Sequence, residues 1–247
     1  MSTITSSSLS PLPINFHTSD AYANRVHAGK ILADTLSQQS AFKDPVLLAL
    51  PRGGVPVACE VAQNLHYSVD IFLVRKFALP ERPEIAAGIV TSGGIQILDP
   101  AFQQVMKLQG ISLDSLEAII AREHAELARR ESAYRQSRPA EPIAGRSVIV
   151  IDDGLTTGAT MRNAIRALRH LSPAHIVAAV PVASPEVCAQ LECEADLVVC
   201  PRMPSSFFSV RRCYRDFSPV LDVEIRNLLH SAASRAHGAS RNRAFHA

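Results

Sequence analysis

Two adjacent carboxylates stand at the end of an apolar run near the middle of the chain. The stretch is VIVIDDGLTTGAT, residues 148–160, in which Asp152 and Asp153 follow four apolar residues. Small residues after the acids let the backbone wrap around an anion, and amides at a helix N-terminus point toward it. Threonine hydroxyls add further donors. We therefore predict a phosphate-binding loop made of Gly154, Thr156, Thr157, Gly158, Ala159 and Thr160.

The two acids limit what this loop can hold. A carboxylate in direct contact with a phosphate would repel it, so Asp152 and Asp153 should face hydroxyl groups or a positive centre nearby. A sugar phosphate meets both demands, with its phosphate in the loop and its ring hydroxyls on the acids. A strand followed by an ordinary capped helix would explain single residues of this stretch, but not the whole combination.

The stretch resembles the signature of the type I phosphoribosyltransferases, which bind 5-phosphoribosyl 1-diphosphate (PRPP). That signature has four apolar residues, two acids, small residues, and then Thr-Thr-Gly with a small residue and Thr. The resemblance implies that Asp152 and Asp153 contact the ribose 2- and 3-hydroxyls and that 156–160 grips the 5-phosphate. The chain looks most like a bacterial branch of the family with PRGG, RK and YRDF elements, and this likeness does not supply the acceptor.

A second loop, LPRGGVP at 50–56, follows another apolar run. Taken alone, Gly53-Gly54 is typical of a tight turn. Glycines also expose backbone amides, and Arg52 can donate two hydrogen bonds to phosphate oxygens. The resemblance implies that this loop binds the pyrophosphate. Members of the family often hold a cis peptide there, and we expect one at Pro51–Arg52.

A third loop is expected after FLVRK, where Arg75 and Lys76 would end a strand. Such residues are also typical of surface charges at a strand end. Residues 77–87 contain two prolines and are predicted to be a loop. The resemblance implies a basic, flexible lid here that closes over the pyrophosphate. This lid is only partly basic, because it contains Glu81, Arg82 and Glu84.

The segment after the last predicted strand, PRMPSSFFSVRRCYRDFSPV, carries the expected acceptor site. In purine-salvage members of the resembled family, an aromatic residue here stacks on the base, and an acid a few residues later helps to bind base or metal. The resemblance therefore indicates Phe207 or Phe208 and Asp216. Arg211 and Arg212 depart from the small residues of that pattern. The phenylalanines are equally typical of a protein core.

The resemblance also implies a chemistry and a metal ion. PRPP transfer breaks a C–O bond at the anomeric carbon, and positive charge develops on the ribose as pyrophosphate leaves. Mg²⁺, held largely by substrate oxygens and water, would neutralise the pyrophosphate with Arg52, Lys76 and the Gly53-Gly54 amides. Asp152 and Asp153 would stabilise the charged sugar. We find no dedicated metal site in the sequence.

Alternating apolar runs and helical patterns predict the fold that positions these loops. It is an α/β domain with a mostly parallel twisted sheet flanked by helices and a small hood from a hairpin and the C-terminal segment. In such sheets ligands bind beyond the carboxyl ends of the strands. The predicted strands are 45–50, 69–76, 146–153, 174–183 and 195–200, and the hairpin is 88–99. The predicted helices are 19–37, 55–66, 113–135, 158–171 and 184–194. Ser19 or Asp20 is expected to cap the first helix, and Ser184 the last. The helix 113–135 is expected to carry the ion pairs Glu126–Arg130 and Glu131–Arg135 on its solvent-exposed face.

One domain accounts for the patterned part of the chain, and we place it at 18–230. Residues 1–17 are rich in Ser, Thr and Pro, and residues 231–247 are small, basic and aperiodic. Both ends are therefore expected to be flexible tails. No internal repeat and no second core is indicated.

Composition narrows the class of protein. The net charge of +2 and the absence of tryptophan give little support to a nucleic-acid partner. No apolar stretch approaches the roughly 18 residues of a membrane span, so no membrane partner is expected. The five cysteines form no CxxC pair and are predicted to be reduced thiols of a cytoplasmic protein. A homodimer would be usual for the resembled family.

These observations predict a phosphoribosyltransferase. It would use PRPP and Mg²⁺, hand the 5-phosphoribosyl group to a nitrogenous base or related nucleophile, and release pyrophosphate. The alternative that the residues leave open is a PRPP-binding regulator or sensor that does not turn over. The sequence does not identify the acceptor.

Overall fold

The computed structural model describes residues 21–39, 42, 44–79, 82–102, 104, 113–136 and 138–244. The expected N-terminal tail and the caps Ser19 and Asp20 lie outside these residues. The elements follow in the order α1 (Arg25–Ser37), β1 (Val46–Ala49), α2 (Gly54–Leu65), β2 (Ser68–Ile71), β3 (Val74–Leu79), β4 (Arg82–Thr91), η2 (Ser92–Gly94), β5 (Gln96–Leu98), α4 (Leu113–Arg135), β6 (Ser147–Ile151), α5 (Ala159–Arg169), β7 (His175–Ala179), α6 (Pro185–Glu192), β8 (Leu197–Val199), η3 (Val210–Cys213) and α7 (Asp222–Ala244).

A five-stranded parallel sheet forms the centre of the protein. Its strand order is β2-β1-β6-β7-β8, and every neighbouring pair is parallel. Strands β1 and β6 are buried along their whole length, as expected for strands covered on both faces. The predicted α/β fold is therefore confirmed. Because β1 and β6 are neighbours, the loops that follow them leave the same edge of the sheet side by side.

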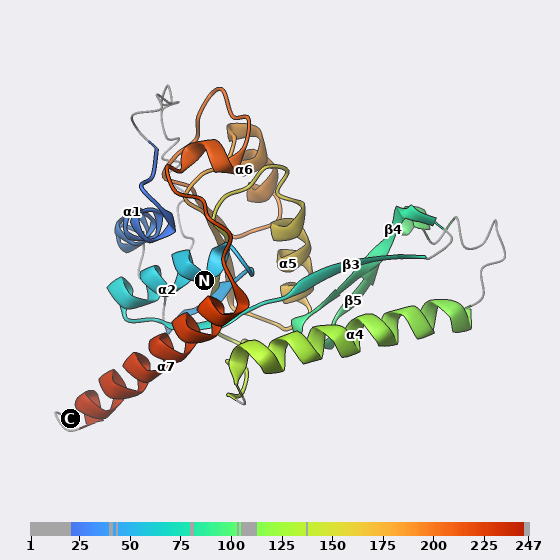
Figure 1. Cartoon of the computed structure of the whole chain (residues 1–247), viewed down its shortest axis with the longest axis horizontal. Coiled ribbons are helices and arrows are strands. Elements are labelled where there is room, and N and C mark those ends of the chain that lie inside the picture. The colour runs from blue at the N-terminus through green and yellow to red at the C-terminus, as the bar shows by residue number, and fades with distance from the viewer. Residues whose placement is uncertain are drawn as a thin grey trace, which may run out of the picture.

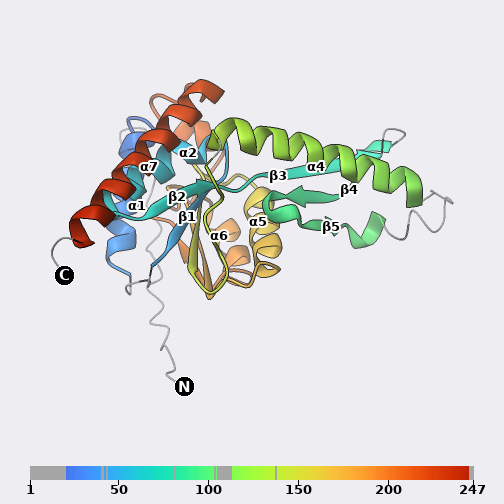
Figure 2. The ribbon, with the colours of Figure 1, turned by 90° about the horizontal axis from the view of Figure 1, so that it is seen from below.

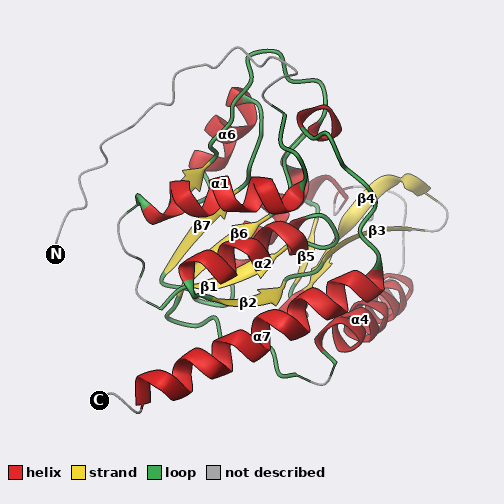
Figure 3. Cartoon of the chain, turned by 60° about the vertical axis from the view of Figure 1, so that its left-hand side comes forward, coloured by secondary structure: helices red, strands yellow, loops and turns green. Residues whose placement is uncertain are grey.

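Alternate residues of each strand face two separate cores. Leu47 and Ile149 belong to the core under α1, α2 and α7, whereas Leu48 and Val150 belong to the core under α5 and α6. Figure 3 looks onto the face that α1, α2 and α7 cover. With helices on both faces, the polar groups of the sheet are exposed chiefly at its ends, where the loops lie.

A second, antiparallel sheet extends from the central one as an arm. It has the order β3-β4-β5, and the long helix α4 runs along it (Figures 1 and 2). The hairpin predicted at 88–99 is confirmed as β4 and β5, with positive φ at Gly93 and Gly94 in the turn.

The prediction of one strand over 69–76 is wrong, because the chain changes sheets within that apolar run. Strand β2 ends at Ile71, and Phe72 N still donates to Ala49 O of the central sheet at 2.9 Å. Leu73 N already donates to Ser92 Oγ of the arm at 2.8 Å. The four residues 71–74 that span the change are all apolar, so the hydrophobic pattern cannot reveal the break.

The prediction of a loop over 77–87 is also wrong. Most of this segment forms β3 and β4, which pair with each other in antiparallel fashion. The register shifts between Phe77 and Ala78 and again between Ala78 and Leu79. Such irregularities let a hairpin accommodate prolines that a regular ladder would exclude. Glu81 lies outside the described residues, as do the side chains of Arg82 and Glu84.

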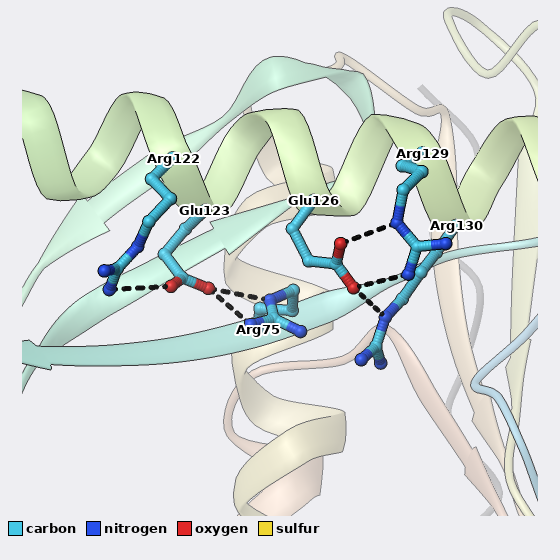
Figure 4. A network of polar contacts seen from close by, with 6 residues as sticks. All are labelled: Arg75, Arg122, Glu123, Glu126, Arg129 and Arg130. Atoms are coloured by element: carbon cyan, nitrogen blue, oxygen red, sulfur yellow. Dashed lines mark hydrogen bonds and ion pairs between the residues drawn. The ribbon is translucent and has the colours of Figure 1, made fainter.

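Helix α4 is tied to the arm and along itself by ion pairs (Figure 4). Arg75 of β3 donates to Glu123 through Nε at 2.8 Å, and Glu126 accepts from Arg129 and Arg130 at 2.7 and 2.8 Å. The predicted Glu126–Arg130 pair is therefore confirmed. The two arginines lower the pKa of Glu126 to about 2, chiefly through their hydrogen bonds to it.

The predicted pair Glu131–Arg135 also forms, at 3.3 Å, but it does not lie on a wet face. Arg135 is largely buried and donates through Nε to both carboxylate oxygens of Asp70, at 2.9 and 3.0 Å. Asp70, at the end of β2 in the central sheet, also accepts from Glu141 N at 3.1 Å. This pair therefore joins α4 to the central sheet.

Two predictions at the chain ends need correction. Helix α1 begins at Arg25 rather than 19, and Asn24 caps it by accepting from His27 N at 2.9 Å. Helix α7 continues to Ala244, so residues 231–244 are helical, which their aperiodic sequence did not indicate; that this tail is flexible stays a prediction. Buried Ile225, Leu229 and Ala232 start this helix on the core, whereas the basic composition beyond them hid its continuation.

We expect Asp70→Ala to destabilise the fold strongly. The change leaves the guanidinium of Arg135 buried without its main partner, which costs about 3 kcal/mol. The free energy of unfolding from urea denaturation measures the effect. Arg166→Gln is the matched control, because it breaks the pair with Glu194 at 2.7 Å on an exposed surface and should cost less than about 1 kcal/mol. Equal losses in the two variants would contradict the prediction.

Candidate functional site

The acid pair leaves the carboxyl end of β6, where the predicted signature begins. Asp153 is buried, and Asp152 is half-buried with its Oδ1 accepting from Asp153 N at 2.9 Å. Leu155 N donates to Val182 O at 3.0 Å, which fixes the loop against the segment after β7. The loop that carries the two acids is thus held between the ends of β6 and β7.

The rest of the signature turns into α5 with an open N-terminus. Gly158 is the N-cap, with φ of 68°, and it has no side chain with which to cap the first turn. Thr157 Oγ1 accepts only a long hydrogen bond, 3.4 Å, from Ala159 N. Thr156, Thr157 and Thr160 are exposed. Amides and hydroxyls at such a helix start suit an oxyanion.

The glycine loop after β1 packs directly on the acid pair. A Cβ on Gly53 would lie 2.0 Å from Asp153 Oδ2, and one on Gly54 would lie 2.5 Å from Ile151 O. No other residue type fits at either position without displacing the signature. The peptide Pro51–Arg52 is cis, as expected. The start of α2 at Gly54 therefore lies beside the same acids as the start of α5.

Arg25 of α1 contacts the acid pair, and sequence reasoning missed it. Its Nε donates to Asp153 Oδ2 at 2.8 Å, and both side chains are largely buried. Its Nη1 donates to Ser218 O at 2.8 Å. Nothing in the residues around Arg25 distinguishes it from an ordinary helix-surface arginine, because its partner is 128 positions away in the chain.

Tyr214 also contacts the acid pair. Its hydroxyl donates to the backbone oxygen of Asp153 at 2.6 Å. Tyr214 belongs to residues 213–218, which we call the strap, and the sequence did mark this place through its YRDF element. Burial raises the pKa of the Tyr214 phenol, so the hydroxyl stays a donor. The strap and the signature are therefore joined at Asp153.

Burial shifts the titration of both acids in the same direction. The pKa of Asp152 is raised well above its ordinary value by burial and then by the neighbouring charge of Asp153. The pKa of Asp153 is raised by burial, and the guanidinium of Arg25 opposes that rise. Two carboxylates this close cannot both ionise freely. A nearby hydroxyl donor or cation would therefore favour the ionised form of these carboxylates.

The predicted basic residues lie apart from one another. Arg52 is exposed and pairs through Nε with Asp222 Oδ1 of α7 at 3.3 Å. Asp222 Oδ1 also accepts from Tyr134 of α4 at 2.8 Å, so Arg52 is oriented toward the start of α7. Lys76 is exposed on β3, in the arm rather than the central sheet, and not at a strand end as predicted.

The predicted acceptor residues fall into two environments. Phe207 is half-buried against the cluster that contains Tyr214, whereas Phe208 is 74% exposed, with the Arg212 guanidinium 5.2 Å from its ring. Asp216 is exposed and accepts from Ser218 N and Oγ at 2.9 and 2.6 Å, bonds that lower its pKa. Phe217, which was not predicted, lies against Arg25, whose Cζ stands 3.9 Å over its ring.

Among the described residues, no group of three or more His, Cys, Asp or Glu side chains could hold a metal ion. The five cysteines, all within those ranges, are free, and all but Cys193 are buried. None of the described helices is both long and apolar enough to span a bilayer.

The chain resembles known proteins over most of its length. Residues 19–200 match the family described as phosphoribosyl transferase domain. A Mycobacterium tuberculosis protein named "Putative phosphoribosyl transferase Rv0571c" is 36% identical over 211 residues, which are 85% of this chain and 47% of that protein. The chain thus spans about half the length of the curated relatives it matches.

A solved structure supports the same relationship. The crystal structure of TT1426 from Thermus thermophilus is 39% identical in sequence and superposes with a TM-score of 0.72. The match covers 85% of this chain and 97% of that one. Both the sequence signature and the whole fold are thereby accounted for, and the chain belongs to the phosphoribosyl transferase domain family.

Proposed function

We propose that the protein is a phosphoribosyltransferase that binds PRPP and transfers its 5-phosphoribosyl group to a nitrogenous base or related nucleophile. The observation that carries the proposal is the packing of the Gly53-Gly54 loop on Asp153, with two helix starts beside it. One ligand with phosphates at both ends and hydroxyls between them matches this arrangement. In the proposed complex with PRPP, residues 156–160 hold the 5-phosphate, the acid pair faces the ribose, and the glycine loop faces the pyrophosphate.

The proposed reaction exchanges one bond at the anomeric carbon for another. The C–O bond to pyrophosphate breaks, and the leaving group takes the electron pair. A bond to the acceptor nitrogen forms, and the acceptor loses a proton. Positive charge on the ribose falls next to Asp152 and Asp153, whose ionised forms stabilise it. In this proposal the Gly53-Gly54 loop faces the leaving pyrophosphate, with the Gly53 amide as its donor, since the Gly54 amide donates to Leu50 O at 3.1 Å.

Mg²⁺ fits the proposed site through the substrate rather than through a protein cage. The ion prefers oxygen ligands and usually binds one or two carboxylates together with phosphate oxygens. PRPP oxygens and water would supply most of its ligands here. When bound, Mg²⁺ would neutralise the leaving pyrophosphate. The proposed roles of Arg52 and Lys76 are to add positive charge there, with Lys76 approaching from the arm.

Base-dependent release of pyrophosphate tests the proposal. The protein is incubated with PRPP, Mg²⁺ and a panel of purine and pyrimidine bases, and pyrophosphate is followed with time. Release that requires one of the bases supports the transferase and identifies its acceptor. Tight PRPP binding without release for any base would instead favour a sensor. Absence of PRPP binding would overturn the proposal.

The double variant Asp152→Asn, Asp153→Asn should lose PRPP binding and turnover, because neutral amides cannot stabilise the developing charge on the ribose. Calorimetric titration with PRPP and Mg²⁺ measures affinity, and circular dichroism checks that the fold is retained. Wild-type affinity in this variant would show that the signature has been misread.

Gly53→Ala should weaken PRPP binding because the new methyl group must push Asp153 or the glycine loop away. Overpacking of this kind also costs about 1–3 kcal/mol of stability. Gly94→Asn is the control, since nothing lies within 4 Å of a Cβ built there and asparagine tolerates its positive φ. If both variants bind PRPP like the wild type, the glycine loop does not shape the site.

Asp152→Asn alone should stabilise the protein at neutral pH while removing PRPP affinity. In the folded state, the pKa of Asp152 is raised above its ordinary value of 3.8. At pH values between 3.8 and this raised pKa, the folded state therefore binds more protons than the unfolded state. Stability therefore falls as pH rises through that window. The amide removes this loss, a gain on the order of 1 kcal/mol in the free energy of unfolding.

Denaturation at several pH values measures this gain. Asp216→Asn is the matched control, because the lowered pKa of Asp216 means that its ionised form favours folding. That variant should lose stability above the ordinary pKa of 3.8 rather than gain it. A loss of stability in Asp152→Asn at neutral pH would contradict the prediction.

A further inference from the structure

One cation from α1 reaches three different groups at the edge of the proposed site. Arg25 donates through Nε to Asp153 Oδ2 at 2.8 Å and through Nη1 to Ser218 O at 2.8 Å, and its Cζ lies 3.9 Å from the centre of the Phe217 ring. Its side chain is only 12% exposed. A charge this enclosed is retained where its partners compensate for lost hydration.

The strap runs beside the segment that leads into α1. Tyr22 N donates to Cys213 O at 2.9 Å, and Arg215 N donates back to Tyr22 O at 2.8 Å. Asp216 N donates to Ala23 O at 3.0 Å. These main-chain bonds bring the strap to Arg25, and the side chain of Arg25 connects it onward to Asp153.

We infer that Arg25 is a positioning residue that fixes the carboxylate of Asp153 and links it to the strap. The orientation of this carboxylate and the packing of the strap are therefore coupled. The inference rests on the proposed function, in which Asp153 faces the ribose of PRPP. Arg25 acts through Asp153 and the strap rather than on the transferred group. It thereby couples the donor side of the site to the segment in which the acceptor residues are expected.

The charges around Asp153 are consistent with this role. Burial opposes the ionisation of Asp153, whereas Arg25 favours it, and a side-chain hydrogen bond with Asp152 acts in the same direction as Arg25. From the strap, Tyr214 faces it as a neutral phenol, and Asp216 lies within the field of Arg25. The glycine loop contributes Gly53, which has no ionisable group. Arg25 is thus the cation that counteracts burial of this carboxylate.

The pH dependence of PRPP affinity separates positioning from a merely structural role. In Arg25→Gln, we expect affinity for PRPP with Mg²⁺ to fall on the order of tenfold at about pH 6. The defect should shrink toward about pH 9, because Asp153 then ionises without its partner. Arg25→Lys should recover part of the affinity, since it keeps the charge but loses the paired donors. Calorimetric titration of each variant against the wild type at each pH gives these ratios.

Hydrogen exchange reports the strap independently of any ligand. The amides of Arg215 and Asp216, which are bonded to Tyr22 O and Ala23 O, should exchange faster in Arg25→Gln than in the wild type. Arg166→Gln, which removes an exposed pair with Glu194, is the control and should leave both affinity and strap exchange unchanged. If Arg25→Gln matches the wild type in both measurements, the inference is wrong. It is equally wrong if the loss of affinity is the same at every pH.

Failure of the proposed function would be recognised separately. If the wild type does not bind PRPP, carboxyl ¹³C titration of Asp153 still decides whether Arg25 controls this acid. A higher titration midpoint in Arg25→Gln than in the wild type, together with faster strap exchange, supports the positioning role. An unchanged midpoint overturns it. Arg25→Lys serves for the same comparison if the glutamine variant does not fold.

Discussion

The close contact between Gly53 and Asp153 constrains everything else at the edge of the sheet. A Cβ at Gly53 would stand 2.0 Å from the carboxylate, so the loop after β1 and the loop after β6 must be shaped together. Parallel pairing of β1 with β6 brings the two loops to the same place, and the burial of both strands holds them there. Two helix starts and two acids then lie at one edge of the sheet, and the charge of buried Asp153 counts for more there than it would in water.

Local patterns in the sequence predicted the central sheet, its flanking helices and the signature loop, because each depends on residues that are near one another in the chain. The parts that failed depend on distant partners. Residues 71–74 remain apolar while the chain passes from one sheet to the other, and the hairpin β3–β4 forms although β4 contains Pro83. Arg25 had no local signal, since its role is defined by Asp153 and Ser218. The acid pair was predictable, whereas its environment was not.

Helix α4 connects the arm to the central sheet through ion pairs. Arg75 contacts Glu123 (Figure 4), so α4 is tied at one point to β3. Arg135 contacts Asp70, which ties α4 at another point to β2. The segment expected to be a loose lid is thus largely a paired hairpin braced by a long helix. In the proposed function, Lys76 would therefore be positioned by a hydrogen-bonded strand rather than by a flexible loop.

The attachment of the strap has an evolutionary consequence. Its bonds to Tyr22 and Ala23 run between main-chain atoms, which every residue type except proline can supply. Apart from Tyr214 and Phe217, which contact Asp153 and Arg25, side chains on the strap can therefore be exchanged over generations while the path of the backbone persists. The loops after β1 and β6 have no such freedom, since Gly53 and Gly54 admit no replacement without a rearrangement. In the proposed function, a lineage with this architecture can keep one donor substrate for a long time and still diversify in its acceptor.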